Sequence, residues 1–287
     1  WSNFKGIFLA TSVVGILAMG VTFVIITAGI DLSVGTVMTF AAVMTGVFIT
    51  NLGIPWPIGV VLGILSGTLM GLVNGTLVAR FGLPPFIATL GMLNIARGLA
   101  LVISELRPIY FPDQPGFNQF FMGSIMEDMG LPDLPNLFFV FVIAAVVTWF
   151  ILGKTIVGRY IFAIGSNEDA TRLSGVRTMR YKASAYIISG TMAGLAGVVL
   201  AARLNSAQPS TGFGYELEAI AAAVIGGTSL AGGEGTITGT IIGAFIISVL
   251  TNGLRLMGIP QEWQITITGV IVIGAVYLDI LRRRQKA

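Results

Sequence analysis

The sequence contains no cysteine and no histidine among its 287 residues. The absence of cysteine excludes disulfide bonds, thiolate chemistry and cysteine metal sites, and the absence of histidine removes the commonest metal ligand and general base. Charged residues are also scarce, because they make up 10% of the chain against about 25% in an ordinary soluble domain. The composition therefore argues against an enzyme and against a soluble domain.

Hydrophobic residues, by contrast, make up 55% of the sequence. A helix needs about 20 mainly apolar residues to cross a membrane, and Gly and Thr are tolerated where such helices pack closely. Nine stretches fit this description: residues 11–30, 36–53, 57–79, 84–104, 136–153, 183–203, 217–231, 237–255 and 263–281. We therefore predict an all-α, polytopic helical membrane protein, with residues 1–287 forming a single transmembrane domain.

The charges between these stretches predict the orientation of the chain. Residues 105–136 hold five acidic residues and one arginine, whereas residues 154–182 carry a net charge of +4 and the C-terminal tail is basic. An excess of Lys and Arg marks cytoplasmic loops, so the acidic segment lies outside, and the basic segment and the C-terminus lie in the cytoplasm. Nine spans then place the observed N-terminus outside, and one further helix upstream is expected if the chain starts in the cytoplasm.

The basic segment, residues 154–182, contains a predicted short helix. Ser166 is its expected N-cap, with Asp169 three residues later, and Gly175 offers a left-handed stop. Such a helix has only about two turns and would be marginal alone in water, so it must pack on its own bundle or on a second protein. We expect a second protein.

Two glycine-rich stretches, residues 29–35 and 226–235, interrupt otherwise apolar segments. Non-helical backbone at membrane depth survives only when it is buried in protein or lines water. We predict that both are broken or re-entrant elements that bound a translocation pathway, with Gly227 and Gly232 as close-approach positions.

A short sequence echo accompanies these breaks. Asn74-Gly75 precedes Gly82-Leu83-Pro84, and Asn252-Gly253 precedes Gly258-Ile259-Pro260. The predicted orientation places the two copies on opposite sides of the membrane, which is typical of the inverted repeats of transporters.

Asp31 and Arg97 are the ionisable residues nearest the hydrophobic interior, where each would cost about 2.5 to 3.5 kcal/mol at a helix centre. Either residue could belong to a polar pathway. Asp31 could instead cap the helix that begins at Ser33, which we favour, and Arg97 could support a helix end.

Other polar side chains have two possible roles. Those on apolar spans, Asn74, Thr89 and Asn94, either bond neighbouring helices or line a pathway. The polar residues that follow residue 204 form ordinary external surface unless a protein docks there; they are Asn205, Ser206, Gln208, Pro209, Glu216 and Glu218.

Gly153-Lys154-Thr155 resembles the end of a phosphate-binding loop, but that motif needs a glycine five positions before Gly153, and the residue there is Thr148. We expect no ATPase activity, no metal site and no cofactor in this chain.

Five stretches, taken in order, resemble the signatures of monosaccharide (ribose-type) ABC importer permeases: residues 29–35, 85–90, 165–175, 206–209 and 214–233. The first is Gly-Ile-Asp-Leu-Ser-Val-Gly, and the third is Gly-Ser-Asn-Glu-Asp-Ala-Thr-Arg-Leu-Ser-Gly. The resemblance covers nearly the whole chain. It is specific for the family, but it does not select one sugar.

The resemblance implies a fold of the vitamin-B12-permease type and a multi-pass subunit in a bacterial inner membrane that imports a small neutral, ribose-like sugar. It also implies four kinds of partner: a cytoplasmic ABC ATPase that carries ATP and Mg, an extracytoplasmic sugar-binding protein, a second permease subunit and the lipid membrane. No nucleic acid is expected. Permeases of this family usually have an additional N-terminal helix.

The resemblance and the residue analysis together give three sets of candidate residues. The pathway set is Asp31, Ser33, Asn74, Thr89, Asn94, Gly227 and Gly232. The ATPase-coupling set is Ser166, Asn167, Glu168, Asp169, Ala170, Arg172 and Leu173. The binding-protein set is Asn205, Gln208, Glu216 and Glu218.

The main alternative is an ion-coupled secondary transporter, in which Asp31 would titrate or bind the coupling ion. A membrane enzyme ranks third, because the sequence lacks the histidine, cysteine and paired buried carboxylates that acid–base or metal chemistry uses.

Overall fold

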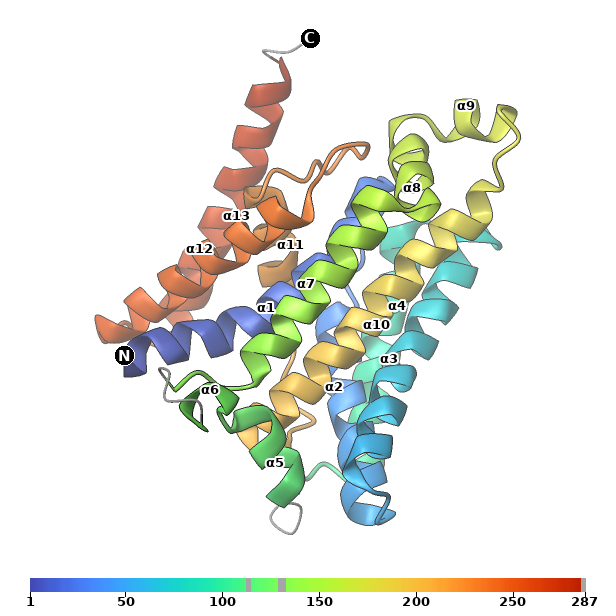
Figure 1. The fold of residues 1–287 in the computed structure, drawn as a ribbon. Helices are drawn as coiled ribbons and strands as arrows, with labels where there is room; N and C mark the ends of the chain where they lie inside the picture. The colour runs from blue at the N-terminus through green and yellow to red at the C-terminus, as the bar shows by residue number, and fades with distance from the viewer. Residues whose placement is uncertain (112–114, 129–132, 285–287) are drawn as a thin grey trace.

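The computed structural model describes residues 1–111, 115–128 and 133–284, and it is built almost entirely from helices (Figure 1). The longer helices are α1 (Ser2–Ile26), α2 (Val34–Gly46), α3 (Trp56–Ala79), α4 (Pro85–Ile103), α7 (Leu137–Lys154), α10 (Thr178–Leu204), α12 (Ile237–Leu256) and α13 (Gln261–Arg284). The shorter elements are the π-helical turn η1 (Val47–Asn51), β1 (Ile109–Tyr110), α5 (Pro115–Met122), α6 (Ile125–Asp128), α8 (Ile156–Ser166), α9 (Glu168–Leu173), β2 (Ser206–Ala207) and α11 (Tyr215–Ile225).

Each of the nine predicted stretches overlaps a helix, and most of these helices are candidates to cross a membrane. Within the described residues, seven are long and apolar enough: α1, α2 with η1, α3, α4, α7, α10 and α12. The seventh predicted stretch needs correction, because α11 has only 11 residues. At 1.5 Å per residue it extends about 16 Å, roughly half of a 30 Å hydrocarbon core. It ends at Ile225 because the glycine-rich stretch begins there.

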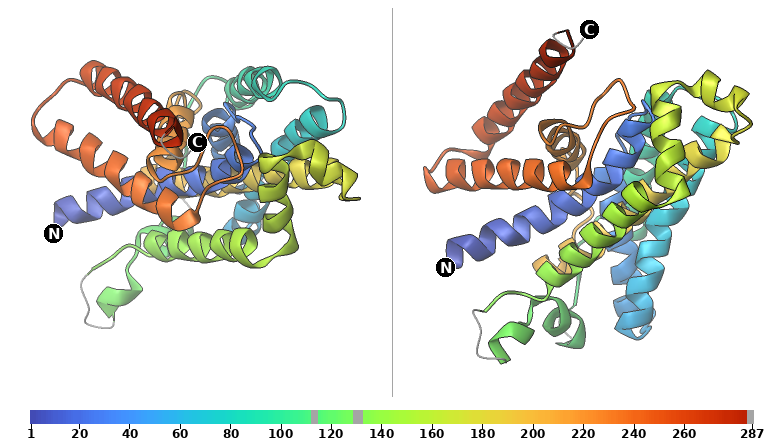
Figure 2. Two further views of the ribbon diagram at one scale, coloured as in Figure 1. Left: turned by 90° about the horizontal axis from the view of Figure 1, so that it is seen from above. Right: turned by 45° about the horizontal axis from the view of Figure 1, so that its top comes forward.

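Helices α1 and α10 pack against each other at the centre of the bundle and run in opposite directions (Figures 1 and 2). Near the start of α1, the Leu9 carbonyl accepts a 3.5 Å hydrogen bond from Arg203, which lies near the end of α10. Towards the other end of α1, Gly20 lies against Ser189, in the middle of α10. The central pair therefore gives the other helices a common support.

Glycines allow α3 and α10 to approach at backbone contact. A Cβ atom added to Gly67 would lie 2.6 Å from the Gly190 carbonyl oxygen and 2.6 Å from the Gly194 Cα. Real Cβ atoms do not approach other atoms so closely, so only glycine fits at this position. Small residues of this kind replace side-chain interdigitation in membrane helix pairs.

The helix packing follows the pattern of the predicted inverted repeat. The first helix of each set packs on the second and third helices of the other set: α10 packs on α2 and α3, and α1 packs on α11 and α12. The sets α1–α4 and α10–α13 therefore make equivalent contacts with each other. Gly75 near the end of α3 lies against Ala183 near the start of α10, and Asn252 near the end of α12 donates to Asn3 near the start of α1 (2.8 Å). Because α1 and α10, the first helices of the two sets, are antiparallel, the two sets have opposite directions. Gly82 and Gly258 occupy equivalent left-handed positions, at φ +69° and +70°, after α3 and α12.

The segment that the sequence places outside, with β1, α5 and α6, lies at the opposite end of the molecule from α8 and α9 (Figure 1). β1 and β2 form a two-residue antiparallel pair, in which Ile109 lies opposite Ala207. Asp133 pairs with Lys5 at the start of α1. The sequence-distant loops at this end are thus tied to one another.

Candidate functional site

A buried carboxylate occupies the break between α1 and α2. Asp31 is only 2% exposed. Its Oδ1 accepts hydrogen bonds from the Ser33 backbone N–H (3.0 Å) and from the Ser33 hydroxyl (2.6 Å), and its Oδ2 accepts from the Ser189 hydroxyl on α10 (2.9 Å). These donors, and the positive N-terminal end of α2 beside them, offset the cost of burying a carboxylate. The prediction that Asp31 caps a helix beginning at Ser33 is wrong, because α2 begins at Val34 and Ser33 is its N-cap residue. Asp31 instead holds Ser33 through the two hydrogen bonds to its Oδ1.

Asn74 extends this network to α3. Its side-chain amide donates to the Ser33 hydroxyl oxygen (2.9 Å), and Ser33 passes the interaction on to Asp31. We call Asp31, Ser33, Asn74 and Ser189 the Asp31 cluster. The space beside it admits no water molecule, and two buried atoms nearby, Asn74 Oδ1 and Tyr186 OH, have no hydrogen-bond partner within the described part of the chain. The cluster is therefore closed in this conformation and has unused hydrogen-bonding capacity.

The remaining polar residues on α4 do not share one location. Thr89 is buried and donates to the Pro85 carbonyl (2.9 Å) and to the Ile30 carbonyl in the break (3.3 Å). Asn94 is exposed and donates to the Leu90 carbonyl of its own helix (3.1 Å). Thr89 thus belongs with the break, whereas Asn94 lies apart from the Asp31 cluster.

Within the described part of the chain, Arg97 makes no hydrogen bond or ion pair that supports a helix end, and its role in a polar pathway stays a prediction. It is exposed, and its guanidinium lies 5.3 Å from the ring centroid of Phe213, in a cation–π arrangement. The arginine therefore links α4 to the segment before α11.

The second break, residues 226–235, touches the first. The Gly233 N–H donates to the Ile26 carbonyl at the end of α1 (2.9 Å). Gly232 has φ +86°, and a Cβ added there would lie 3.0 Å from both the Cβ and the N of Ala28. Gly227 also has a positive φ, +91°, but a Cβ there would meet no atom within 4 Å. The two glycines that the sequence groups together therefore differ, because only Gly232 is in a close contact.

Glu216 is a second buried carboxylate at a helix N-terminus, and the prediction of an external loop is wrong for it. It lies in the first turn of α11 at 4% exposure and accepts the Gly214 N–H at 3.0 Å. A Cβ added to Gly35 at the start of α2 would lie 2.5 Å from its Oε2, and Thr39 donates to the Thr211 carbonyl (2.7 Å). The starts of α2 and α11 therefore face each other across this carboxylate.

Glu218 also belongs to the first turn of α11 and is partly buried, so it is not loop surface either. Ser206 and Pro209 are buried as well. Of the binding-protein set, Asn205 is exposed, with a left-handed φ of +48°, and Gln208 is half-buried. Asn205 is therefore the exposed member of the set, Gln208 and Glu218 are partly exposed, and Glu216 is buried.

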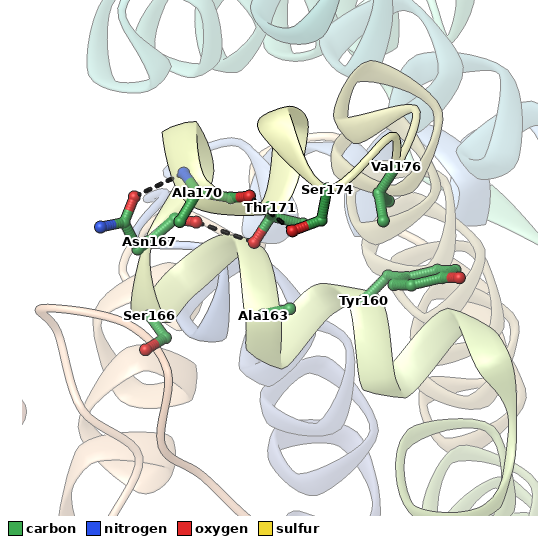
Figure 3. A pocket seen from close by; sticks show the side chains of 8 residues that line it. All are labelled: Tyr160, Ala163, Ser166, Asn167, Ala170, Thr171, Ser174 and Val176. Atoms are coloured by element: carbon green, nitrogen blue, oxygen red, sulfur yellow. Dashed lines mark hydrogen bonds between the residues drawn. The ribbon is translucent and has the colours of Figure 1, made fainter.

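Helix α9 projects from the end of the bundle and forms a hollow of about 390 Å³ with α8 (Figure 3). Asn167 caps α9, because its side-chain oxygen accepts the Ala170 N–H at 2.9 Å; the sequence-based assignment of Ser166 as the cap is wrong, since Ser166 ends α8. Gly175 has the predicted left-handed conformation, at φ +83°.

The outer surface of α9 combines neutralised charge with an exposed apolar residue. Arg172 pairs with Asp169 (2.9 Å), and Lys182 pairs with Glu168 (2.8 Å). Leu173 is 85% exposed although it is a large apolar side chain. α9 thus presents an apolar tip between ion pairs, which suits contact with another protein.

Several residues of the site were missed by the sequence analysis. Ser189 and Tyr186 lie within a long apolar helix, where one hydroxyl gives no sign of its partner. Gly165, at the end of α8, also makes close contact with the two breaks. Only the three-dimensional packing identifies these residues. Across the described residues, no group of three Asp or Glu side chains converges to form a metal site.

The sequence is similar to known membrane transport proteins over nearly its whole length. The family described as "Branched-chain amino acid transport system / permease component" matches residues 3–276. The chain is 40% identical to the ribose import permease protein RbsC of Bacillus subtilis over 278 residues, which are 96% of this chain and 84% of that protein. It is 39% identical to the fructose import permease protein FrcC of Rhizobium meliloti, over 96% of this chain and 77% of that protein. It is also 39% identical to the D-allose transport system permease protein AlsC of Escherichia coli, over 98% and 84%.

A solved structure, PsaBC from Streptococcus pneumoniae in complex with Fab, has a similar fold. The TM-score is 0.51 at 15% sequence identity, and the match covers 98% of this chain and 91% of that chain. At this identity the similarity concerns the fold alone.

Proposed function

Because the chain belongs to the family of branched-chain amino acid transport system permease components, we propose that it is the membrane subunit of an ATP-driven importer for a small neutral sugar. The observation that carries this proposal is the 40% identity to a ribose import permease over 96% of the chain. The hydroxyl and amide groups of the Asp31 cluster suit a neutral sugar, and the buried Asp31 carboxylate disfavours an anionic solute, which would need a compensating positive charge within the membrane.

We assign the division of labour as follows. α9 docks a separate ABC ATPase, which binds ATP and Mg, and the two breaks bound the pathway. Asn205 and Gln208, with the elements near them, face an external sugar-binding protein, and a second permease subunit completes the pathway. The protein is a multi-pass protein of a bacterial inner membrane with a cytoplasmic C-terminus. The cytoplasmic assignment of the C-terminus is supported by the position of α13, which ends at the same end of the molecule as α9, the proposed ATPase dock (Figure 1).

The solute class is tested by competition. With the permease, its ATPase and its binding protein in proteoliposomes, neutral pentoses and hexoses are expected to inhibit uptake of a labelled monosaccharide, whereas charged amino acids are not. Uptake should also depend on ATP without any ion gradient. Inhibition by amino acids alone would contradict the sugar proposal, and a requirement for an ion gradient would favour the secondary transporter.

The ATPase dock is tested by changing the tip of α9. The double variant Arg172→Ala, Leu173→Ala removes the exposed apolar side chain and one ion pair, and uptake is expected to fall at least about tenfold while membrane insertion is unchanged. The matched control is Leu52→Ala, which alters another leucine that is 63% exposed but lies after η1, far from α9. Normal uptake in the double variant would show that the ATPase docks on a surface other than α9.

A further inference from the structure

Three backbone segments lie in close contact where the two breaks touch. They are the end of α1 at Ile26 to Ala28, the end of α8 at Gly165, and the loop at Gly232 and Gly233. The Gly233 N–H donates to the Ile26 carbonyl (2.9 Å). A Cβ added to Gly165 would overlap that same carbonyl and lie 2.5 Å from the Gly233 nitrogen, and one added to Gly232 would lie 2.8 Å from the Gly165 carbonyl oxygen. We call this contact the glycine junction.

The backbone conformation of the junction is as specific as its packing. Gly232 and Gly233 have φ values of +86° and +74°, and Ala28, a residue with a side chain, has φ +58°. Such conformations are rare for residues other than glycine and persist where the surroundings enforce them. The three segments cannot slide past one another unless the hydrogen bond breaks and the backbones separate, so the junction has the properties of a rigid clamp.

The clamp joins two functional regions through very short segments. On one side, Gly165 is two residues from Asn167, the N-cap of α9. On the other side, Ile26 is five residues from Asp31, which holds Ser33 and Ser189. Displacement of α9 therefore has a continuous backbone route to the Asp31 cluster.

We propose that the glycine junction makes α9 and the Asp31 cluster move as one body, and that Gly165 is a positioning residue for the coupling of ATP hydrolysis to transport. This inference rests on the proposed importer function. Two distant sites are coupled only if a structural element connects them and responds to both. The glycine junction is such an element between α9 and the Asp31 cluster.

The first test is Gly165→Ala in the complete importer, reconstituted with its ATPase and binding protein. The added methyl group collides with the neighbouring backbones and separates the three segments, but it does not change the side chains on the surface of α9. The variant is expected to retain the ATPase subunit on purification and to hydrolyse ATP, while solute uptake per ATP hydrolysed falls at least about tenfold. The matched control is Gly153→Ala on α7, where an added Cβ meets no atom within 4 Å, and its coupling is expected to be normal.

The outcomes separate the two proposals. A wild-type complex that takes up no sugar would contradict the proposed function before any variant is considered. A Gly165→Ala importer with normal uptake per ATP would overturn the clamp. Loss of ATPase binding in that variant would also overturn it, because Gly165 would then shape the dock rather than transmit its movement.

Hydrogen exchange tests rigidity independently and uses the unchanged protein. In the complete wild-type importer, the Gly233 N–H donates to the Ile26 carbonyl across the junction. If the junction is a clamp, the Gly233 amide exchanges no faster during ATP-driven uptake than in the resting complex. Faster exchange during uptake would show that the junction opens as a moving hinge and would overturn the proposal.

Discussion

Replacement of Asp31 by alanine is expected to destabilise the permease strongly and to abolish uptake. The substitution leaves the Ser33 N–H, the Ser33 hydroxyl and the Ser189 hydroxyl without their acceptor in a buried position. Each buried donor left unsatisfied costs about 1 to 3 kcal/mol, so the total loss is on the order of 3 kcal/mol or more. The measurements are thermal unfolding of the purified protein and uptake in proteoliposomes.

Two further variants show whether this effect comes from the network. Asp31→Asn keeps one carbonyl oxygen for Ser33 and places an amide against the Ser189 hydroxyl, which can rotate to accept it, so its loss of stability is expected to be smaller. Glu234→Ala removes an exposed carboxylate from the second break and is expected to unfold like the wild type. If Asp31→Ala unfolds and transports like Glu234→Ala, the Asp31 cluster has no structural or functional role.

The sequence predicts most of the helices because membrane spans are long, apolar and nearly free of charge. The prediction overextends at α11, where residues 226–231 are apolar enough to continue a span but contain paired glycines that end the helix at Ile225. Hydrophobicity measures solubility in lipid, whereas the end of a helix depends on local backbone conformation. The break after α1 is easier to recognise, because an aspartate lies within it.

The candidate site is only partly predictable for the same reason. Asp31 and Asn74 stand out because their polarity is costly in an apolar segment, and the structure brings them together through Ser33. Ser189 does not stand out, because a hydroxyl can bond its own helix and carries no sequence record of its partner. A prediction from polarity alone places Glu216 on the surface, and this is wrong. An acidic side chain at a helix start can be buried when backbone N–H groups donate hydrogen bonds to it.

Close packing is the property that the sequence conceals most. The sequence does not distinguish a glycine packed against another backbone from a glycine that faces open space. Only the structure shows that Gly67 and Gly91 differ in this way. A Cβ added to Gly67 would lie 2.6 Å from α10 atoms, whereas a Cβ added to Gly91 on α4 would meet no atom within 4 Å. The two positions therefore form a matched pair for the last prediction.

Alanine substitutions at Gly67 and Gly91 are expected to have opposite effects on stability. Alanine has a higher helix propensity than glycine by about 1 kcal/mol, so Gly91→Ala should be neutral or stabilising. At Gly67 the same methyl group must separate α3 from α10, and overpacking of this kind costs about 1 to 3 kcal/mol, which outweighs the propensity gain. Gly67→Ala should lower the unfolding temperature in detergent and reduce uptake, while Gly91→Ala should do neither. An equal rise in unfolding temperature for both variants would show that α3 and α10 separate freely and that their backbone contact does not hold the bundle together.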